Sequence, residues 1–246
     1  MINYRLVLIH GFTESPSMWN EIIAELDVAH IEICTPSIPG HGNHLSIPAE
    51  HTAKSYCEKL LEQLPDDELP CIIVGHSMGG YLTAHLVQLI PHRVKAIGFF
   101  HSKAGSDDAQ KIEDRKRAIQ AASYNKDLYL ASMLRNTLAE CNVERLEHEL
   151  SLMIETAKRD ISYECISAAQ QVMIERSDAI NYLSKAHFPI NYFLGTEDKS
   201  IPYANMTHEL GSLPHAHIDL AENTGHMGHI ECKSAAIAWL RKICLS

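Results

Sequence analysis

The chain has 246 residues, of which 46% are hydrophobic and 21% are charged, so it can form one large domain or a core with an insertion. Its net charge of −10 argues against nucleic acid or an anionic membrane as the main partner, because both would repel an acidic surface. No run approaches the ~18 apolar residues of a membrane span, and no secretory signal is visible. The seven cysteines are widely spaced and contain no C-x-x-C pair, which favours reduced thiols in a cytoplasmic protein.

Short apolar runs alternate with helical patterns along most of the chain. Strands are predicted for the runs at 5–9, 30–34, 71–75, 94–100, 190–195 and, more weakly, 216–220. Amphipathic helices are predicted at 17–26, 51–64, 81–90 and 234–244. Strands that alternate with helices predict an α/β domain with a mostly parallel sheet, whose crossovers are right-handed.

The stretch from about Lys103 to Lys185 interrupts this alternation. It contains no convincing strand pattern and about four charged, amphipathic helical segments. One crossover rarely needs so many residues, although ordinary crossover helices are the alternative. We therefore expect an α/β core formed by residues 1–102 and 186–246, with a helical cap inserted at 103–185.

The segment GHSMGG at 75–80 lies between an apolar run and a helical pattern. It fits G-x-S-x-G with Ser77 at the centre, in the strand–turn–helix context that gives this motif meaning. Gly75 and Gly79 leave room for a sharp bend that would expose the Ser77 hydroxyl at the sheet edge. The N–H of Met78 would start the next helix and be free to bind an oxyanion. Ser77 is therefore the candidate nucleophile, although the motif alone also occurs by chance.

The segment HGFTESPSMW at 10–19 follows the first predicted strand. Its glycine turn would place the N–H of Phe12 as the second oxyanion donor. We expect His10 to hold this loop by hydrogen bonds and Trp19 to pack beneath it.

The acid and the base are expected on two later loops. Asp198 follows a predicted strand by three residues and is the candidate acid, with Glu197 as the neighbouring alternative. His226 follows the last predicted strand and is the candidate base, with His229 as the alternative. The chain order serine, aspartate, histidine is the one known for hydrolases of this topology.

Together these segments resemble the α/β-hydrolase superfamily. The segments that carry the resemblance are HGF at 10–12, PGHG at 39–42, GHSMGG at 75–80, GTEDKSIP at 195–202 and GH at 225–226. Members of this superfamily usually have two antiparallel strands before the strand that bears HG. The resemblance therefore implies a trimmed, six-stranded sheet with the order 4-3-5-6-7-8 in the family's strand numbering. In the family the PGHG loop borders the active site, so we expect His41 to touch the substrate or the cap, with a glycine-rich turn as the alternative.

The expected cap would form the acyl or alcohol pocket. Its apolar residues would either line that pocket or pack the cap helices against one another. The residues concerned are Leu128, Leu130, Met133, Leu134, Met153, Ile154 and Met173.

The residues Ser77, Asp198 and His226 predict a serine hydrolase that cleaves a small or medium carboxylic ester through an acyl-enzyme. The expected partner is a small-molecule ester, and a homodimer is one possible assembly. The sixteen histidines contain no zinc-binding pattern, and this chemistry needs neither a metal ion nor an organic cofactor. The alternatives are hydrolysis of a carbon–carbon bond, a lyase or acyl-transfer reaction, and a ligand receptor of the same fold.

Overall fold

The computed structural model describes residues 2–42 and 46–245, and its centre is one parallel sheet. The strands are β1 (Tyr4–Ile9), β2 (Ile31–Cys34), β3 (Cys71–His76), β4 (Val94–Phe100), β5 (Ile190–Gly195) and β6 (His217–Ala221). They lie in the order β2-β1-β3-β4-β5-β6, and every neighbouring pair is parallel. The predicted α/β fold with a six-stranded sheet is therefore confirmed, and the strand order agrees with the one that the resemblance implied.

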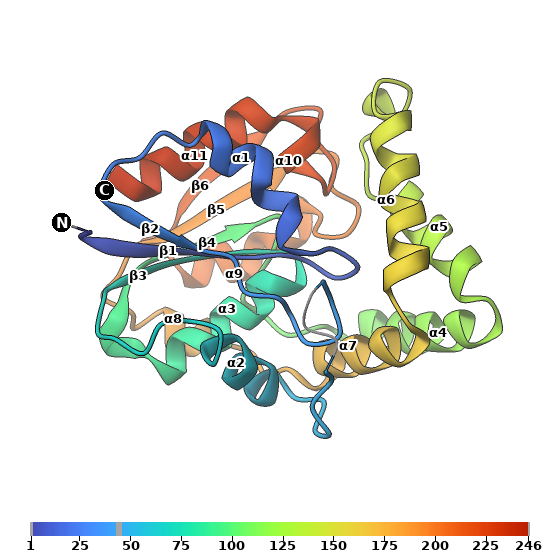
Figure 1. Ribbon diagram of the computed structural model, residues 1–246, viewed down its shortest axis with the longest axis horizontal. Coiled ribbons are helices and arrows are strands. Elements are labelled where there is room, and N and C mark those ends of the chain that lie inside the picture. Colours follow the sequence, from blue (N-terminus) through green and yellow to red (C-terminus); the bar gives the residue numbers. More distant parts are fainter. Residues whose placement is uncertain (1, 43–45, 246) are drawn as a thin grey trace.

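Helices cover both faces of this sheet (Figure 1). One face carries α1 (Asn20–Glu25) and α11 (Lys233–Leu245), and the other carries α2 (Ala53–Leu61), α3 (Met78–Leu89), α8 (Ile180–Leu183) and α9 (Thr207–Ser212). The short helix α10 (Gly228–Glu231) directly precedes α11. Because both faces are covered, the central strands β3 and β5 are buried throughout, and this is why their sequences are continuous apolar runs.

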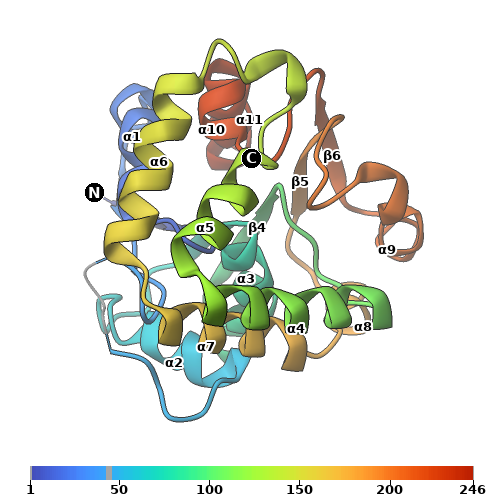
Figure 2. The same cartoon turned by 90° about the vertical axis from the view of Figure 1, so that its right-hand side faces the viewer.

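Four longer helices lie between β4 and β5 in the chain: α4 (Ala109–Tyr124), α5 (Lys126–Arg135), α6 (Glu147–Asp160) and α7 (Tyr163–Glu175). We call them the inserted helices. They stand together at the end of the sheet where β4, β5 and β6 finish (Figures 1 and 2). The side chains of Asp108, Asn125 and Ser162 cap the N-termini of α4, α5 and α7 by accepting backbone N–H bonds. Buried apolar residues from these helices form a separate cluster, while the domain boundaries at 103 and 185 stay a prediction.

One difference from the expected helices lies at the GHSMGG segment. The helix expected from residue 81 begins at Met78, so both glycines that follow belong to it. Gly79 in the helix and Gly75 in the strand are both needed for close packing. A Cβ on Gly79 would lie 2.4 Å from the carbonyl oxygen of His10, and a Cβ on Gly75 would lie 2.2 Å from the carbonyl carbon of Gly79. Strand and helix therefore approach closely at two points where no larger residue fits.

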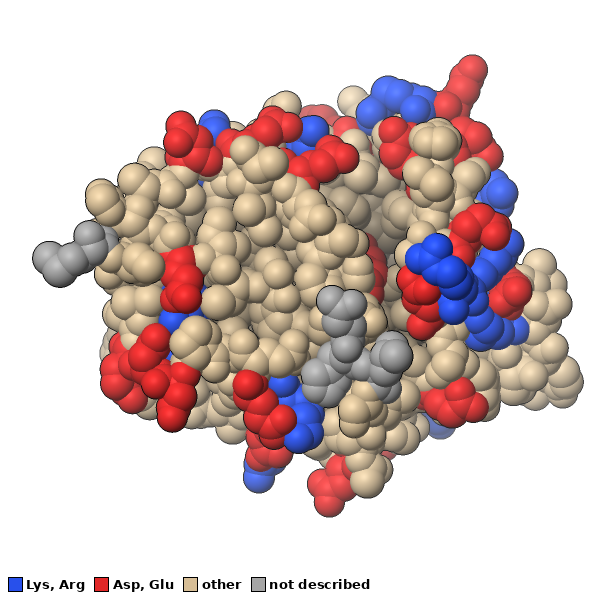
Figure 3. Space-filling model, in the orientation of Figure 1, with Lys and Arg blue, Asp and Glu red and all other residues tan. Residues whose placement is uncertain are grey.

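The surface carries both signs of charge. Acidic and basic side chains are interspersed on the face seen in Figure 3 rather than gathered into one patch. Within the described residues, no helix is both long enough and apolar enough to cross a bilayer. All seven cysteines are free thiols, as their spacing predicted.

Candidate active site

Ser77 lies on the sharp turn between β3 and α3. Its backbone has φ 49° and ψ −116°, a conformation that a residue with a side chain rarely adopts. Hydrogen bonds hold the turn in place, because the Ser77 carbonyl oxygen accepts from the N–H of Gly80 at 3.0 Å and from the Ser102 hydroxyl at 2.7 Å. The surrounding structure therefore fixes a strained residue, and the Ser77 side chain lines a cavity beside it.

The structure brings Ser77, His226 and Asp198 into one hydrogen-bonded row. His226 Nε2 lies 2.9 Å from Ser77 Oγ, and His226 Nδ1 lies 2.8 Å from Asp198 Oδ2. Because a carboxylate only accepts, Nδ1 carries the proton and Nε2 is left to accept one from the serine. The two alternatives are placed elsewhere: Glu197 is exposed, and the ring of His229 packs at 5.9 Å from that of His76.

Asp198 is almost completely buried and is held at both carboxylate oxygens. Its Oδ1 accepts the backbone N–H groups of Ser200 at 2.8 Å and Ile201 at 2.9 Å, while Oδ2 faces His226 and His101. Burial alone would raise the pKa of Asp198, but the two histidines lower that pKa far below its ordinary value. The carboxylate therefore stays charged and its orientation is fixed.

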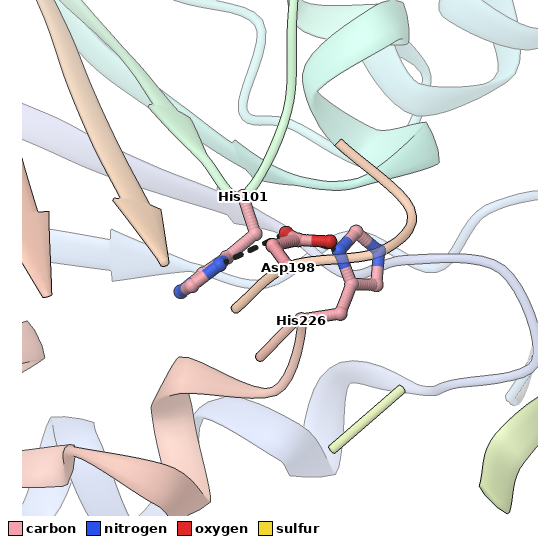
Figure 4. A group of neighbouring side chains, drawn as sticks. All are labelled: His101, Asp198 and His226. Atoms are coloured by element: carbon pink, nitrogen blue, oxygen red, sulfur yellow. Dashed lines mark hydrogen bonds and ion pairs between the residues drawn. The ribbon is translucent and has the colours of Figure 1, made fainter. Parts of the chain in front are cut away.

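His101 is a second imidazole on the same carboxylate, and the sequence analysis did not find it. It follows β4 directly with φ 46°, and its Nδ1 lies 3.3 Å from Asp198 Oδ2, so Asp198 sits between two rings (Figure 4). Burial lowers the pKa of His101, which favours its neutral form. Its position at the carboxyl end of a buried strand was the available signal, because open α/β sheets place their sites at this edge.

The side chains of His101, Asp198 and His226 also fall within the spacing of a metal site, since their ligand atoms lie within 4.8 Å of one another. Both Nδ1 atoms, however, lie at hydrogen-bond distance from the same oxygen. A metal ion bound at about 2.0–2.2 Å from each ligand would have to replace these hydrogen bonds. The observed arrangement therefore fits an oriented carboxylate.

Of the two predicted oxyanion donors, one belongs to a residue that lines the same cavity and the other to the residue that follows Ser77. Phe12 lines the cavity together with Ser77, and Met78 is the first residue of α3. Within the described part of the chain, neither of these N–H groups donates a hydrogen bond to a protein acceptor. Both donors are thus left for a ligand, and the one on Met78 also has the positive end of the helix behind it.

The cavity at Ser77 measures about 200 Å³ and lies between the sheet edge and the inserted helices. Of the apolar residues considered in the sequence, Met133 and Met173 line it. Leu130, Leu134 and Ile154 are instead buried in the separate cluster of the inserted helices. Helical spacing could not distinguish the two groups, because both lie on apolar faces.

The loop after β1 is held by histidines. His10 accepts the N–H of Ile38 on Nε2 at 3.0 Å, so its Nδ1–H donates to the Gly11 carbonyl oxygen at 2.8 Å. Burial lowers the pKa of His10 to about 3. His41 is also buried, with its Nδ1 3.5 Å from the Cys165 sulfur on α7, so it contacts an inserted helix.

A buried ion pair, which the sequence pattern did not predict, lies beneath the site. Glu14 Oε2 accepts the Gly11 N–H at 2.6 Å and lies 2.8 Å from His76 Nδ1, while His76 Nε2 lies 2.9 Å from the His226 carbonyl oxygen. Both ring nitrogens of His76 face oxygen acceptors, so the ring is doubly protonated. Burial lowers the pKa of His76, but the Glu14 carboxylate outweighs it and raises that pKa overall. The pair ties the loop before α1 to the backbone that carries His226.

We expect Glu14→Gln to lower the free energy of unfolding by about 3 kcal/mol, because it leaves the buried imidazolium without its counter-charge. The pKa of Glu14 is lowered from 4.5 to about 2, so its contribution is present above pH 4.5 and is lost as pH falls. The pKa of His76 is raised from 6.5, so its contribution is present below pH 6.5 and is lost as pH rises. Urea unfolding should therefore show the largest difference in free energy of unfolding between the wild type and Glu14→Gln from pH 4.5 to 6.5. A difference independent of pH would contradict the ion pair.

The fold places this chain in the α/β-hydrolase class. A model of the alpha/beta hydrolase family matches residues 6–238, so the chain belongs to this family. Among solved structures, a thermophilic esterase from Thermogutta terrifontis superposes with a TM-score of 0.84 at 21% identity, covering 98% of this chain and 90% of that one. This likeness supports the fold.

Curated relatives include pimeloyl-[acyl-carrier protein] methyl ester esterases from several bacteria. The one from Pseudoalteromonas atlantica is 25% identical over 250 residues, which cover 89% of this chain and 93% of that protein. The one from Aromatoleum aromaticum is 37% identical over 90 residues, which cover 36% of this chain but only 33% of that protein. The higher identity is thus confined to about a third of the relative's length.

Proposed function

We propose that the protein is a serine hydrolase that cleaves a small or medium carboxylic ester through an acyl-enzyme. One observation carries the proposal: the Ser77 hydroxyl lies 2.9 Å from His226 Nε2, while the opposite ring nitrogen lies 2.8 Å from the buried Asp198. A serine, a base and an orienting acid in this arrangement form an activated nucleophile. The esterase relatives favour an ester as the substrate.

In the first half-reaction, Ser77 Oγ attacks the ester carbonyl carbon as His226 Nε2 takes its proton. Asp198 holds the ring in the required tautomer and stabilises the imidazolium that forms. The N–H groups of Phe12 and Met78 bind the negatively charged oxygen, and one such donor is typically worth about 3–4 kcal/mol. The tetrahedral intermediate then collapses, and His226 donates its proton to the departing alcohol.

In the second half-reaction, His226 takes a proton from water, which attacks the acyl-enzyme. The carboxylic acid leaves as Ser77 regains its proton from His226. The inserted helices act as the cap, at residues 103–185, and with Met133 and Met173 they close the acyl or alcohol pocket over the serine. Methionine side chains adapt to differently shaped groups, which suits a permissive pocket.

A fluorophosphonate probe tests the proposal directly, because it reacts only with an activated serine. We expect the folded protein to be labelled rapidly at Ser77, as located by mass spectrometry of its peptides, and to hydrolyse short p-nitrophenyl esters. Ser102→Ala, which removes a neighbouring buried hydroxyl, should still be labelled at Ser77. Hydrolysis of a β-diketone with no ester turnover would assign carbon–carbon chemistry instead. Tight ligand binding without labelling or turnover would assign a receptor.

A further inference from the structure

A second hollow adjoins the active-site cavity. Tyr81, Lys111 and Ser200 line both and therefore lie at the boundary between them. The second hollow measures about 350 Å³ and lies between the start of α4 and the loop after β5. Its basic residues are Lys103, Lys111 and Lys199, and we call it the lysine hollow.

The carboxylates of the lysine hollow are already engaged. Asp107 is buried between two arginines: its Oδ1 lies 2.7 Å from Arg176, and its Oδ2 bonds to Arg115. Asp108 caps α4, where its Oδ1 accepts the backbone N–H of Lys111 at 2.7 Å. Neither acid therefore forms an ion pair with the Lys111 ammonium, and the three lysines that line the hollow outnumber its two aspartates in a chain whose net charge is −10.

The acidic residue that lines the active-site cavity is engaged as well. Asp114 pairs with Arg117 and accepts a hydrogen bond from Gln110 at 3.1 Å, both on its own helix. On the hollow side, Lys103 donates to the Ser106 carbonyl oxygen at 3.0 Å and lies 3.6 Å from Asp107 Oδ1. The lysine at the boundary between the two cavities is Lys111.

The ammonium of Lys111 has no hydrogen-bond or ion-pair partner within the described residues, although the side chain is half-buried. Burial lowers its pKa and the nearby Arg115 lowers it further, and together they outweigh the opposite effect of Asp107, Asp114 and Asp198. A partly desolvated ammonium beside another cation is costly to leave unpaired, so a bound anion would stabilise it. Because Lys111 and Ser77 line the same cavity, a substrate whose ester group lies at Ser77 can place a second group against Lys111.

We propose that the substrate ester carries an anionic group, a carboxylate or a phosphate, which Lys111 binds at the entrance to the lysine hollow. This inference rests on the proposed function, because it places the ester group of the same molecule at Ser77. Lys103 and Lys199 contribute further positive charge around the anion. The hollow would thus select one class of ester, while the groups at Ser77 carry out the chemistry.

The test compares charged and neutral esters within each variant. The substrates are monomethyl esters of dicarboxylic acids of increasing length, methyl esters of monocarboxylic acids of matching length, and acetyl esters of phosphorylated and unphosphorylated alcohols. We expect the wild type to prefer one anionic series, and Lys111→Met to reduce that preference in kcat/KM about tenfold or more. The ratio within each variant cancels any general loss of activity.

Lys116→Met is the matched control, since Lys116 lies on the same helix, is exposed and pairs with Glu113. Its ratio of anionic to neutral kcat/KM should equal that of the wild type.

The outcomes separate the inference from the proposed function. Two results would contradict anion binding by Lys111 but agree with the proposed hydrolase. One is that the wild type hydrolyses neutral esters and shows no preference for anionic ones; the other is that Lys111→Met keeps the wild-type preference. A folded wild type that hydrolyses no ester would overturn both. Lys111→Glu should reverse the preference, and the series that responds more strongly to Lys111 identifies carboxylate or phosphate as the anion.

Discussion

Replacing Ser77 with alanine is expected to abolish ester hydrolysis, with kcat falling by about 10⁴-fold or more. The reason is that, among the described residues, Ser77 is the one whose hydroxyl lies at hydrogen-bond distance from His226 Nε2, at 2.9 Å, while the Ser102 hydroxyl donates to the Ser77 carbonyl oxygen. Steady-state assays with p-nitrophenyl esters measure the loss. Thermal unfolding should change little, because alanine keeps the backbone and removes only the hydroxyl.

Ser102→Ala is the matched control for this variant. It removes a buried hydroxyl next to the same turn, and we expect it to lose less than about tenfold in kcat, since the bond that it deletes supports the backbone of Ser77. If Ser77→Ala retained turnover near the wild-type rate while staying folded, Ser77 would not be the nucleophile. Equal losses in both variants would likewise point to a damaged turn rather than to missing chemistry.

The sheet and the row of Ser77, His226 and Asp198 could be foreseen because local patterns determined both. Parallel strands that are covered on both faces need continuous apolar runs, and the positions that follow such runs share one sheet edge. Candidate residues at the ends of parallel strands are therefore expected to lie near one another. Their catalytic roles stay a prediction, since proximity is a geometric fact and turnover has to be measured.

The residues that surround this row could not be foreseen in the same way. Glu14 and His76 are 62 positions apart, and neither belongs to a pattern that names the other as a partner. His101 is 97 positions from Asp198, and Lys111 is one of many charged residues on α4. The contacts that suggest a role for these residues arise only from tertiary packing, so the sequence around each of them does not indicate that role.

Asp198→Asn is expected to lower kcat by about 10⁴-fold while leaving the fold intact. Oδ1 can still accept the N–H groups of Ser200 and Ile201, so the side chain keeps its place. Its amide N–H₂ group then replaces Oδ2 and faces the Nδ1 atoms of His226 and His101, where a donor would meet a donor. His226 must shift its proton to Nε2, and it can no longer accept one from the serine.

The measurement is kcat for a p-nitrophenyl ester at several pH values, with Glu197→Gln as the matched control. Glu197 is adjacent in the chain but exposed, so its variant should lose less than about threefold. Because the pKa of Asp198 is lowered far below its ordinary value, wild-type activity should not fall in mild acid through protonation of this carboxylate. A loss of less than about tenfold in Asp198→Asn would mean that another acid orients His226, and a large loss in Glu197→Gln would assign that acid. The buried position of Asp198 between two imidazoles argues for the large loss in Asp198→Asn, since an orienting charge acts most strongly where water is excluded.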